Sequence, residues 1–284
     1  MDIQLSWFAF GIYAAAFVFF LVTFLERQRG RSVSGIVVLS IGLLVHLAAI
    51  IIRAKAAGHL PFASRFEALV FYALVTAALV LALSLVRRDL PIAFLSLPLV
   101  LVFLLGALTG KAKAPHALPP VLSSPFFLIH VLLSFAGYGI YTVNVGLAVG
   151  SLFAVKASSH KPQATIELPQ ATSLKPQAIP RLASVEELLG LVRRLVPWGL
   201  LTLGAGIALG GIWALFSWGT WWSWDPKETG ALVTWLSYVA YVHSPFWPAR
   251  PRKAEALLPV FGYLLLLVTF LGISLLKWGV HAYQ

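Results

Sequence analysis

The chain has 284 residues, of which 60% are hydrophobic and only 11% are charged. Soluble domains usually carry about 25% charged residues, so this composition excludes an ordinary soluble fold and indicates a protein that crosses the membrane several times. The net charge of +11 does not indicate nucleic-acid binding, because no soluble domain gathers the basic residues on one face. The chain has no cysteine, so any sulfur chemistry must be brought by another molecule.

Eight apolar runs follow one another along the chain, each close to or above the ~20 residues that cross a bilayer as a helix. Lipid offers no partner to the backbone, which leaves helices or closed barrels, and the runs lack the alternation of barrel strands. We therefore predict one all-α domain over residues 1–284, a polytopic integral membrane protein with eight transmembrane helices. The runs are 3–25, 33–52, 68–86, 90–108, 126–155, 198–217, 229–246 and 256–276.

The basic residues predict the orientation, because cytoplasmic loops are enriched in Lys and Arg. With the N-terminus outside, the inner segments hold fourteen of the 21 basic residues and the outer segments hold seven. Both termini are therefore expected on the extracytoplasmic side. The first run is not read as a signal peptide, because it carries Asp2 and no basic segment precedes it.

The only long inner segment lies between the fifth and sixth runs. Residues 156–184 are rich in Pro, Gln, Ser and Ala over most of their length, so we expect a flexible cytoplasmic loop. Ser184 and Glu187 then form a Ser-x-x-Glu pattern at the start of SVEELLGLVRRLV. This pattern predicts a capping box and a short amphipathic helix ahead of the sixth run.

The eight runs contain no Asp, Glu, Lys or Arg, and their ionisable side chains are His46, His130 and His243. Ion pumps usually need charged groups within the membrane, so that class of protein is disfavoured. Imidazole is instead a common axial ligand of haem iron. A single His in a membrane helix is more often a hydrogen-bond partner between helices, and that reading is preferred for His46.

The remaining candidates lie at different depths. His130 is near the outer start of a run of about 45 Å, at ~1.5 Å per residue, and His281 follows the last run, so both are expected outside. His243 is expected roughly 21 Å from the outer start of the seventh run, in the inner part of the membrane, at the same rise per residue. One iron could be shared by His130 and His281, but not by either of them with His243. If both places bind haem, there are two sites at different depths.

A tryptophan-rich segment, WGTWWSWDPKETG, occupies residues 218–230, and we expect residues 217–228 to form an extracytoplasmic loop between the sixth and seventh runs. Indole rings packed so densely make a large, rigid apolar surface, which suits a flat aromatic ligand such as haem. Asp225, Pro226 and Glu228 also fit the N-cap, first and third positions of a helix that opens the seventh run. Four of the ten tryptophans belong to this segment: Trp218, Trp221, Trp222 and Trp224.

This segment resembles the "WWD" signature of haem-handling membrane proteins, and the whole chain is similar to their CcsA (ResC) branch. AGHLPFASRFEAL at 57–69, with Glu67, resembles that branch's Gly-His-x-Pro segment, which leads to an acidic residue. IHVLLSFAGY at 129–138 and the closing KWGVHAYQ resemble the segments with the external haem ligands, and AYVHSP resembles the segment with the histidine inside the membrane. The resemblance thus implies external ligands at His130 and His281 and an embedded ligand at His243.

The resemblance further implies a role in cytochrome c maturation. Haem b would cross the membrane and be presented to an apocytochrome with a Cys-x-x-Cys-His motif, in a holocytochrome c synthase formed with a CcsB (ResB) subunit. The second ligand at His243 would come from a CcsB histidine, with His46 the weaker candidate. Trp218, Trp222 and Trp224, with Trp221 beside them, would cover the porphyrin. Lys227, Arg53 or Arg65 would pair with the haem propionates. Asp225 and Glu228 would orient the tryptophan-rich segment.

Other classes of function stay open at this point. A membrane b-type cytochrome for electron transfer would also use paired histidines, although it normally places both ligands of each haem inside the bundle. A haem-binding assembly factor without ligase activity is a further alternative, as is a transporter of another flat ligand. The expected location is the bacterial cytoplasmic membrane, or a thylakoid membrane. Lipid and the protein partners named above are expected contacts, and nucleic acid is not.

Overall fold

The fold was analysed in a computed structural model that describes residues 1–26, 31–62, 64–88, 91–110, 114, 118–159, 183–246 and 252–272. Within these residues every regular element is helical, as predicted. The eight α-helices are α1 (Asp2–Glu26), α2 (Arg31–Ala57), α3 (Arg65–Val86), α4 (Ile92–Thr109), α5 (Pro125–Ser159), α6 (Val185–Trp218), α7 (Pro226–His243) and α8 (Arg252–Leu267). Three shorter turns of helix lie at Pro120–Leu122, Ser244–Phe246 and Val268–Gly272.

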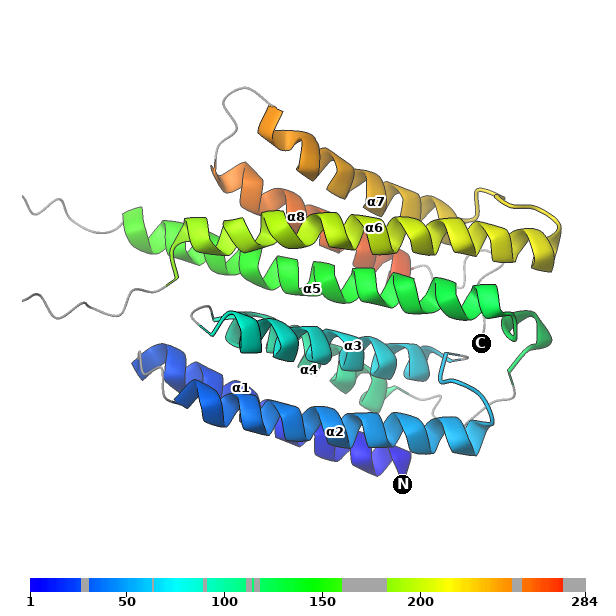
Figure 1. The fold of residues 1–284 in the computed structure, drawn as a ribbon, viewed down its shortest axis with the longest axis horizontal. Coiled ribbons are helices and arrows are strands. Elements are labelled where there is room, and N and C mark those ends of the chain that lie inside the picture. The colour runs from blue at the N-terminus through cyan, green and yellow to red at the C-terminus, as the bar shows by residue number, and fades with distance from the viewer. Residues whose placement is uncertain are drawn as a thin grey trace, which may run out of the picture.

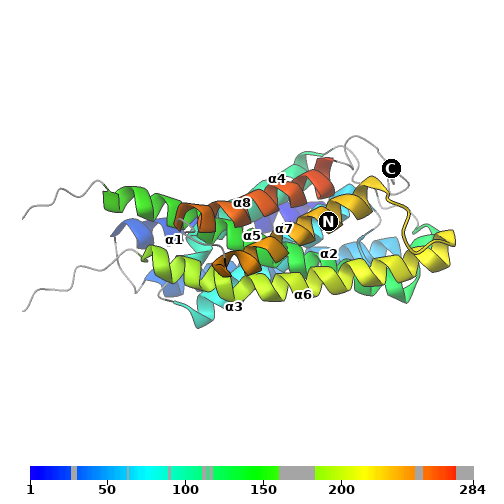
Figure 2. The same ribbon diagram turned by 90° about the horizontal axis from the view of Figure 1, so that it is seen from above.

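The helices lie side by side along the long axis of the molecule (Figure 1). Helices α1 to α4 form one group and α5 to α8 form the other, and α3 and α4 both pack against α5. The N-terminus, the α2–α3 connection and the α6–α7 connection lie at the same end of the bundle, on the right in Figure 1. We call this the outer end, after the predicted orientation, and the opposite end the inner end. Figure 2 shows the helices nearly parallel from a second direction.

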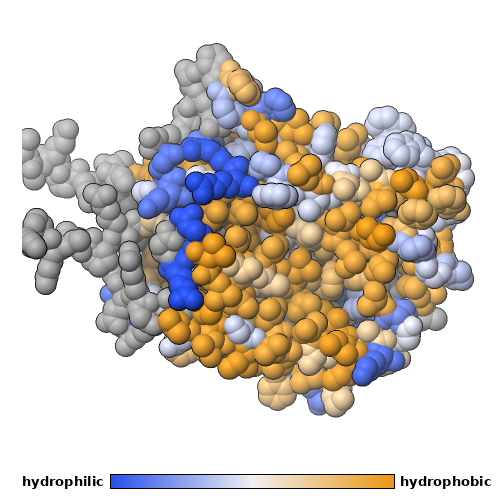
Figure 3. All heavy atoms as spheres, in the orientation of Figure 1, coloured by the Kyte–Doolittle hydropathy of each residue, from blue (hydrophilic) through white to orange (hydrophobic). Residues whose placement is uncertain are grey.

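Seven of the described helices are long and apolar enough to cross a membrane, namely α1 to α6 and α8 with its final turn. Hydrophobic atoms cover most of the face in Figure 3, while the most hydrophilic atoms gather towards its ends. Helix α7 is not among the seven; its sequence begins with Pro-Lys-Glu-Thr and continues with several hydroxyl side chains. The eighth transmembrane span therefore stays a prediction, as does the orientation of the termini.

Helices α5 and α6 make the most extensive contact in the bundle. Glycines allow this approach: a Cβ at Gly137 would lie 3.1 Å from the Leu203 Cβ, and one at Gly199 would overlap the Tyr141 ring. Small residues commonly let membrane helices pack backbone to backbone. The outer part of the same interface holds His130, one of the candidate ligands.

The two groups of helices meet at a buried cluster of tyrosines. The Tyr72 hydroxyl of α3 lies 2.6 Å from the Thr142 hydroxyl of α5 and 3.4 Å from the Tyr263 hydroxyl of α8. The Tyr72 ring also contacts Phe135 and Phe270, with centroid distances of 5.9 and 5.5 Å. Buried hydroxyls need such partners, because an unmade hydrogen bond in an apolar interior is costly.

The start of α6 confirms one prediction and corrects another. Ser184 caps the helix, and the predicted capping box with Glu187 is present. Residues 185–218 nevertheless form one continuous helix, so the separate short amphipathic helix is not found. Proline usually interrupts a helix, but here one face of the helix, with Val196 and Gly199 beside Pro197, is buried against the bundle. Most of the predicted flexible loop, residues 160–182, lies outside the described residues, and α5 continues to Ser159.

Candidate functional site

The tryptophan loop, which we define as Trp218 to Asp225, joins the outer ends of α6 and α7. Helix α6 ends at Trp218, and Gly219 follows in the left-handed region with φ 77°. Only seven residues separate the two helices, since α7 begins at Pro226. The predicted cap is present: Asp225 is the N-cap, Pro226 opens the helix and Glu228 completes a capping box.

The indoles of this loop form an accessible apolar surface. Trp218, Trp221 and Trp224 are exposed by 43%, 55% and 70%, whereas Trp222 is half-buried. Trp222 and Trp224 meet edge to face with centroids 5.9 Å apart. Large exposed aromatic surfaces of this kind usually serve to bind a ligand or partner.

His130 lies on α5, half-buried against the glycines of α6. Its Nδ1 is 2.6 Å from the carbonyl oxygen of Gly206, and because a carbonyl only accepts, this nitrogen carries the proton and donates. A Cβ at Gly210 would lie 2.7 Å from the same nitrogen. An iron bound to this imidazole would therefore be held through Nε2, the usual arrangement when a carbonyl orients a ligating histidine.

Gly211, which follows Gly210 in α6, places the tryptophan loop beside His130. A Cβ at Gly211 would lie 3.1 Å from the Trp221 carbonyl oxygen and 3.3 Å from its ring. Neighbouring glycines thus contact His130 and Trp221, respectively. The structure brings these two residues to one part of α6, although they are far apart in the sequence. His281, the expected second external ligand, lies outside the described residues.

His243 is the last residue of α7 and lies at the opposite end of that helix from the tryptophan loop. Its side chain is exposed, and its Nδ1 is 2.8 Å from the Val239 carbonyl oxygen of the same helix. The structure therefore separates His243 from His130 along the bundle. An exposed imidazole at this place is open to a ligand or to a partner protein.

His46 is fully buried, and its Nδ1 lies 3.2 Å from the Tyr13 hydroxyl of α1. This is the hydrogen bond between helices that its sequence position suggested. Helix α2 packs against α1 and α3 and lies on the far side of the bundle from α7 (Figure 1). The structure therefore does not bring His46 to His243, and a shared iron would not fit this arrangement.

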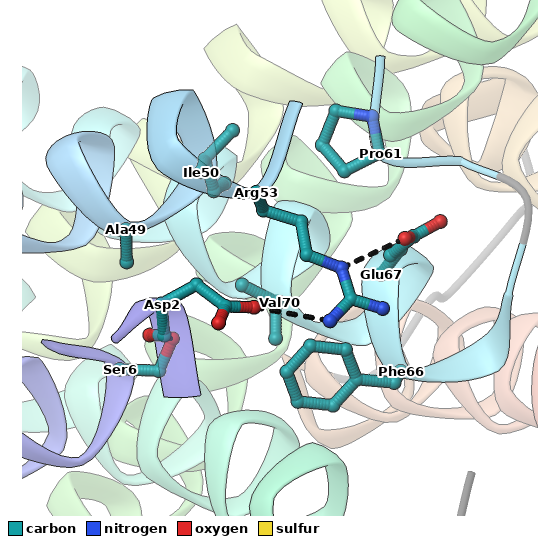
Figure 4. Close-up of a pocket in the computed structure, with 9 residues that line it drawn as sticks. All are labelled: Asp2, Ser6, Ala49, Ile50, Arg53, Pro61, Phe66, Glu67 and Val70. Atoms are coloured by element: carbon teal, nitrogen blue, oxygen red, sulfur yellow. Dashed lines mark hydrogen bonds and ion pairs between the residues drawn. The ribbon is translucent and has the colours of Figure 1, made fainter. Parts of the chain in front are cut away.

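Arg53 and Glu67 form a buried ion pair at the outer end of α2 and α3. The Arg53 Nε lies 2.9 Å from Glu67 Oε1, and its Nη1 lies 3.0 Å from Asp2 Oδ2. Figure 4 shows the guanidinium between the two carboxylates and over the Phe66 ring, whose centroid is 4.9 Å away. A cavity of about 10 Å³ beside it has room for roughly one water.

The three candidate cations for the propionates differ in their surroundings. Arg53 is engaged within the protein, whereas Arg65 is exposed and Lys227 is half-buried beside Asp225.

Two features of α6 and of the tryptophan loop were not predicted from the sequence. The first is the pair Gly206 and Gly210, whose spacing of four residues is a known signal for close helix contact and could have drawn attention to them. The second is Trp224, which has φ 58° although it is not a glycine. No local pattern in the sequence indicates that conformation.

Comparison with known proteins identifies curated relatives of similar length. The family model described as "Cytochrome C assembly protein" matches residues 6–281. "Cytochrome c biogenesis protein CcsA" of Prochlorococcus marinus (strain MIT 9313) is 33% identical over 276 residues, which cover 89% of this chain and 86% of that protein. The protein of the same name from Synechococcus sp. (strain WH7803) is 32% identical, with 90% and 87% covered.

Among solved structures, "Cytochrome c Heme Lyase CcmF" superposes with a TM-score of 0.64 at 15% identity. The match covers 95% of this chain but only 45% of the larger protein, so it shows a shared fold. Nearly the whole chain matches both the family model and the curated relatives. The chain therefore belongs to the cytochrome c assembly protein family, in its CcsA group.

Proposed function

We propose that this protein acts in cytochrome c maturation: it carries haem b across the membrane and presents it at the outer end for attachment to apocytochrome c. The observation that carries the proposal is the placement of His130 and Trp221 on adjacent glycines of α6. A ligating imidazole and exposed indoles at one place form a site for a flat, iron-containing ligand.

The candidate donors fit haem, because imidazole is a common ligand of its iron. His130 would hold the iron through Nε2, and His281, which lies outside the described residues, would supply the second ligand. The indoles of Trp218, Trp222 and Trp224 would cover the porphyrin and keep water away from it. Lys227 and Arg65 are the remaining candidates for pairing with the propionates.

When bound, haem supplies two vinyl groups, across each of which a thiol S–H of the Cys-x-x-Cys-His substrate adds to form a thioether. This protein contributes no thiol, because its sequence has no cysteine. Its residues act by binding and orientation, which can supply most of the acceleration when two reactants must meet in one geometry.

The inner end fits an earlier stage of the same process. His243 is exposed there, with its Nδ1 next to a carbonyl oxygen of its own helix. It would bind haem within the membrane together with a histidine of a CcsB-type subunit, since His46 lies on the other side of the bundle. We infer a multi-pass location in the bacterial cytoplasmic membrane or in a thylakoid membrane, and the cyanobacterial relatives are compatible with both.

The rival functions make different demands on the histidines. A b-type cytochrome would need paired ligands inside the bundle, whereas the fully buried histidine among the described residues, His46, is hydrogen-bonded to Tyr13. An assembly factor without ligase activity would share the haem site. The two functions are distinguished by an attachment assay with the protein purified together with its CcsB-type partner. A haem synthase complex would attach haem to a Cys-x-x-Cys-His peptide, and an assembly factor would not.

The first experiment is the absorption spectrum of the complex in detergent, for the wild type, His130→Ala and His281→Ala. We expect a reduced low-spin b-type haem spectrum that weakens in either variant and recovers with added imidazole. His59→Ala is the matched control, because His59 lies in the α2–α3 connection at the outer end and should leave the spectrum unchanged. Haem that is indifferent to both ligand changes would refute the assignment of the external site.

A further inference from the structure

Trp224 has an unusual backbone conformation. With φ 58° it is the one residue other than glycine with positive φ among those that the structure describes. Bulky side chains avoid this region because the Cβ atom collides with the neighbouring carbonyl group. Such a conformation persists where the surroundings impose it, and it is often found at functional sites.

The first turn of α7 supplies the bonds that impose it. Glu228 Oε2 accepts three hydrogen bonds, from the Ser223 N–H at 2.8 Å, the Ser223 hydroxyl at 3.1 Å and the Asp225 N–H at 3.3 Å. The Thr229 hydroxyl donates to the Trp224 carbonyl oxygen at 3.2 Å. The peptide group after Trp224 is therefore bound at both its oxygen and its N–H. Since the Ser223 N–H is bound as well, the chain is held on both sides of Trp224.

These contacts go beyond what starting a helix requires. In a capping box the third residue of the helix accepts from the N–H of the N-cap residue, as Glu187 does from Ser184 at the start of α6. Glu228 makes that bond to Asp225 and in addition reaches two residues further back, to both donors of Ser223. Successive backbone N–H groups around a left-handed residue form a concave site for an anion, and here the Glu228 carboxylate occupies it.

We propose that Glu228 is a positioning residue of the tryptophan loop. Its carboxylate holds Trp224 in the left-handed conformation and so keeps the exposed Trp224 indole in edge-to-face contact with the Trp222 ring. This inference rests on the proposed haem site, where Trp224 would cover the porphyrin. Without the carboxylate, Trp224 returns to an ordinary backbone conformation and its indole leaves that position. Glu228 itself does not touch the ligand.

The first test measures the loop in the absence of haem. The full-length protein is labelled with 5-fluorotryptophan, and its fluorine NMR spectrum is recorded in detergent, with Trp213→Phe, Trp222→Phe and Trp224→Phe to assign the three resonances. Glu228→Ala should shift the Trp224 and Trp222 resonances and leave the buried Trp213 unmoved. Glu228→Gln, which keeps an acceptor oxygen of the same reach but no charge, should shift them less. Glu187→Ala, the matched loss of a capping glutamate at the inner end, should leave all three in place.

A Trp224 resonance that stays in place in folded Glu228→Ala would overturn the proposal. So would a general shift of all the resonances in both Glu228→Ala and Glu187→Ala, because that pattern indicates a loss of helix stability alone. If Glu228→Ala does not fold, Glu228→Gln decides by the same criteria.

The second test measures binding of iron protoporphyrin IX. Glu228→Ala should weaken the affinity about tenfold, the size typical of residues that orient a binding group. The haem that does bind should keep its low-spin spectrum, because the axial histidines are intact. Equal affinity in the two proteins would overturn the positioning role. If the wild type binds no haem, the proposed function fails, and the fluorine spectra still decide whether Glu228 positions the loop.

Discussion

Removal of the Arg53 guanidinium should strongly destabilise the outer end of the bundle. Arg53 and Glu67 are 4% and 1% exposed, and the bonded atoms are 2.9 Å apart. Loss of one partner of a buried pair leaves the other charge uncompensated and typically costs about 3–5 kcal/mol. Glu67 would retain the Ser64 N–H at 3.2 Å and its place at the N-terminus of α3. We therefore expect the lower part of that range, about 3 kcal/mol, for Arg53→Met.

The double variant separates the ion pair from simple packing. Glu67→Gln alone should cost about 2 kcal/mol, because Gln carries no charge and has one acceptor oxygen, so it cannot accept from both the Arg53 Nε and the Ser64 N–H. Arg53→Met combined with Glu67→Gln should cost only about 1–2 kcal/mol, since neither buried charge is then left without its partner. The two single costs would thus exceed the cost of the double variant by about 3–4 kcal/mol, which is the coupling energy of the pair.

The assay is unfolding by SDS in mixed detergent micelles at constant pH, followed by circular dichroism. Arg65→Met is the control, because Arg65 is an exposed arginine two residues from Glu67 and should change the free energy of unfolding by less than about 0.5 kcal/mol. The reasoning is refuted if Arg53→Met behaves like this control. It is equally refuted if the double variant loses the sum of the two single costs.

Three further changes test other contacts. Gly210→Ala places a Cβ 2.7 Å from the His130 Nδ1 and should displace the imidazole. Bound haem is then expected to lose its low-spin spectrum while the protein remains folded. An unchanged spectrum would contradict the proposed orientation of His130. Tyr13→Phe removes the hydroxyl that is bonded to His46 and should lower the free energy of unfolding by about 1–3 kcal/mol, checked by SDS unfolding. Ser184→Ala removes the cap of α6 and should cost about 1 kcal/mol; hydrogen exchange should increase in the first turn of that helix and not at its outer end.

The helices and their capped starts could be predicted because the signals are local. Long apolar runs determine the transmembrane helices through the requirement that every backbone group be paired within the segment. The caps at Ser184 and Asp225 depend on side chains only three residues apart. The position of Pro197 inside one long helix was not predicted, because the burial of Val196 and Gly199 near it depends on contacts with other helices, such as that of Gly199 with Tyr141 of α5.

Contacts between distant residues explain most of what the sequence did not reveal. Arg53 lies just beyond the second apolar run, and helix α2 continues to Ala57 and brings it to Glu67 and Asp2. These partners are 14 and 51 residues away. The resemblance identified His130 as a candidate ligand, yet its partner Gly206 is 76 residues away. Charge and hydropathy alone do not specify such pairs.

The glycines of α6 explain how a histidine can be partly exposed and still have a fixed orientation. An imidazole in a loop would need several side chains to hold it, whereas His130 lies directly on a helix backbone and donates from Nδ1 to the Gly206 carbonyl oxygen. Any side chain at Gly210 would occupy the space of the ring. Small residues that let two membrane helices approach therefore also determine which nitrogen the histidine presents. At the outer end of α6, helix packing and the orientation of the His130 imidazole thus depend on the same backbone contact.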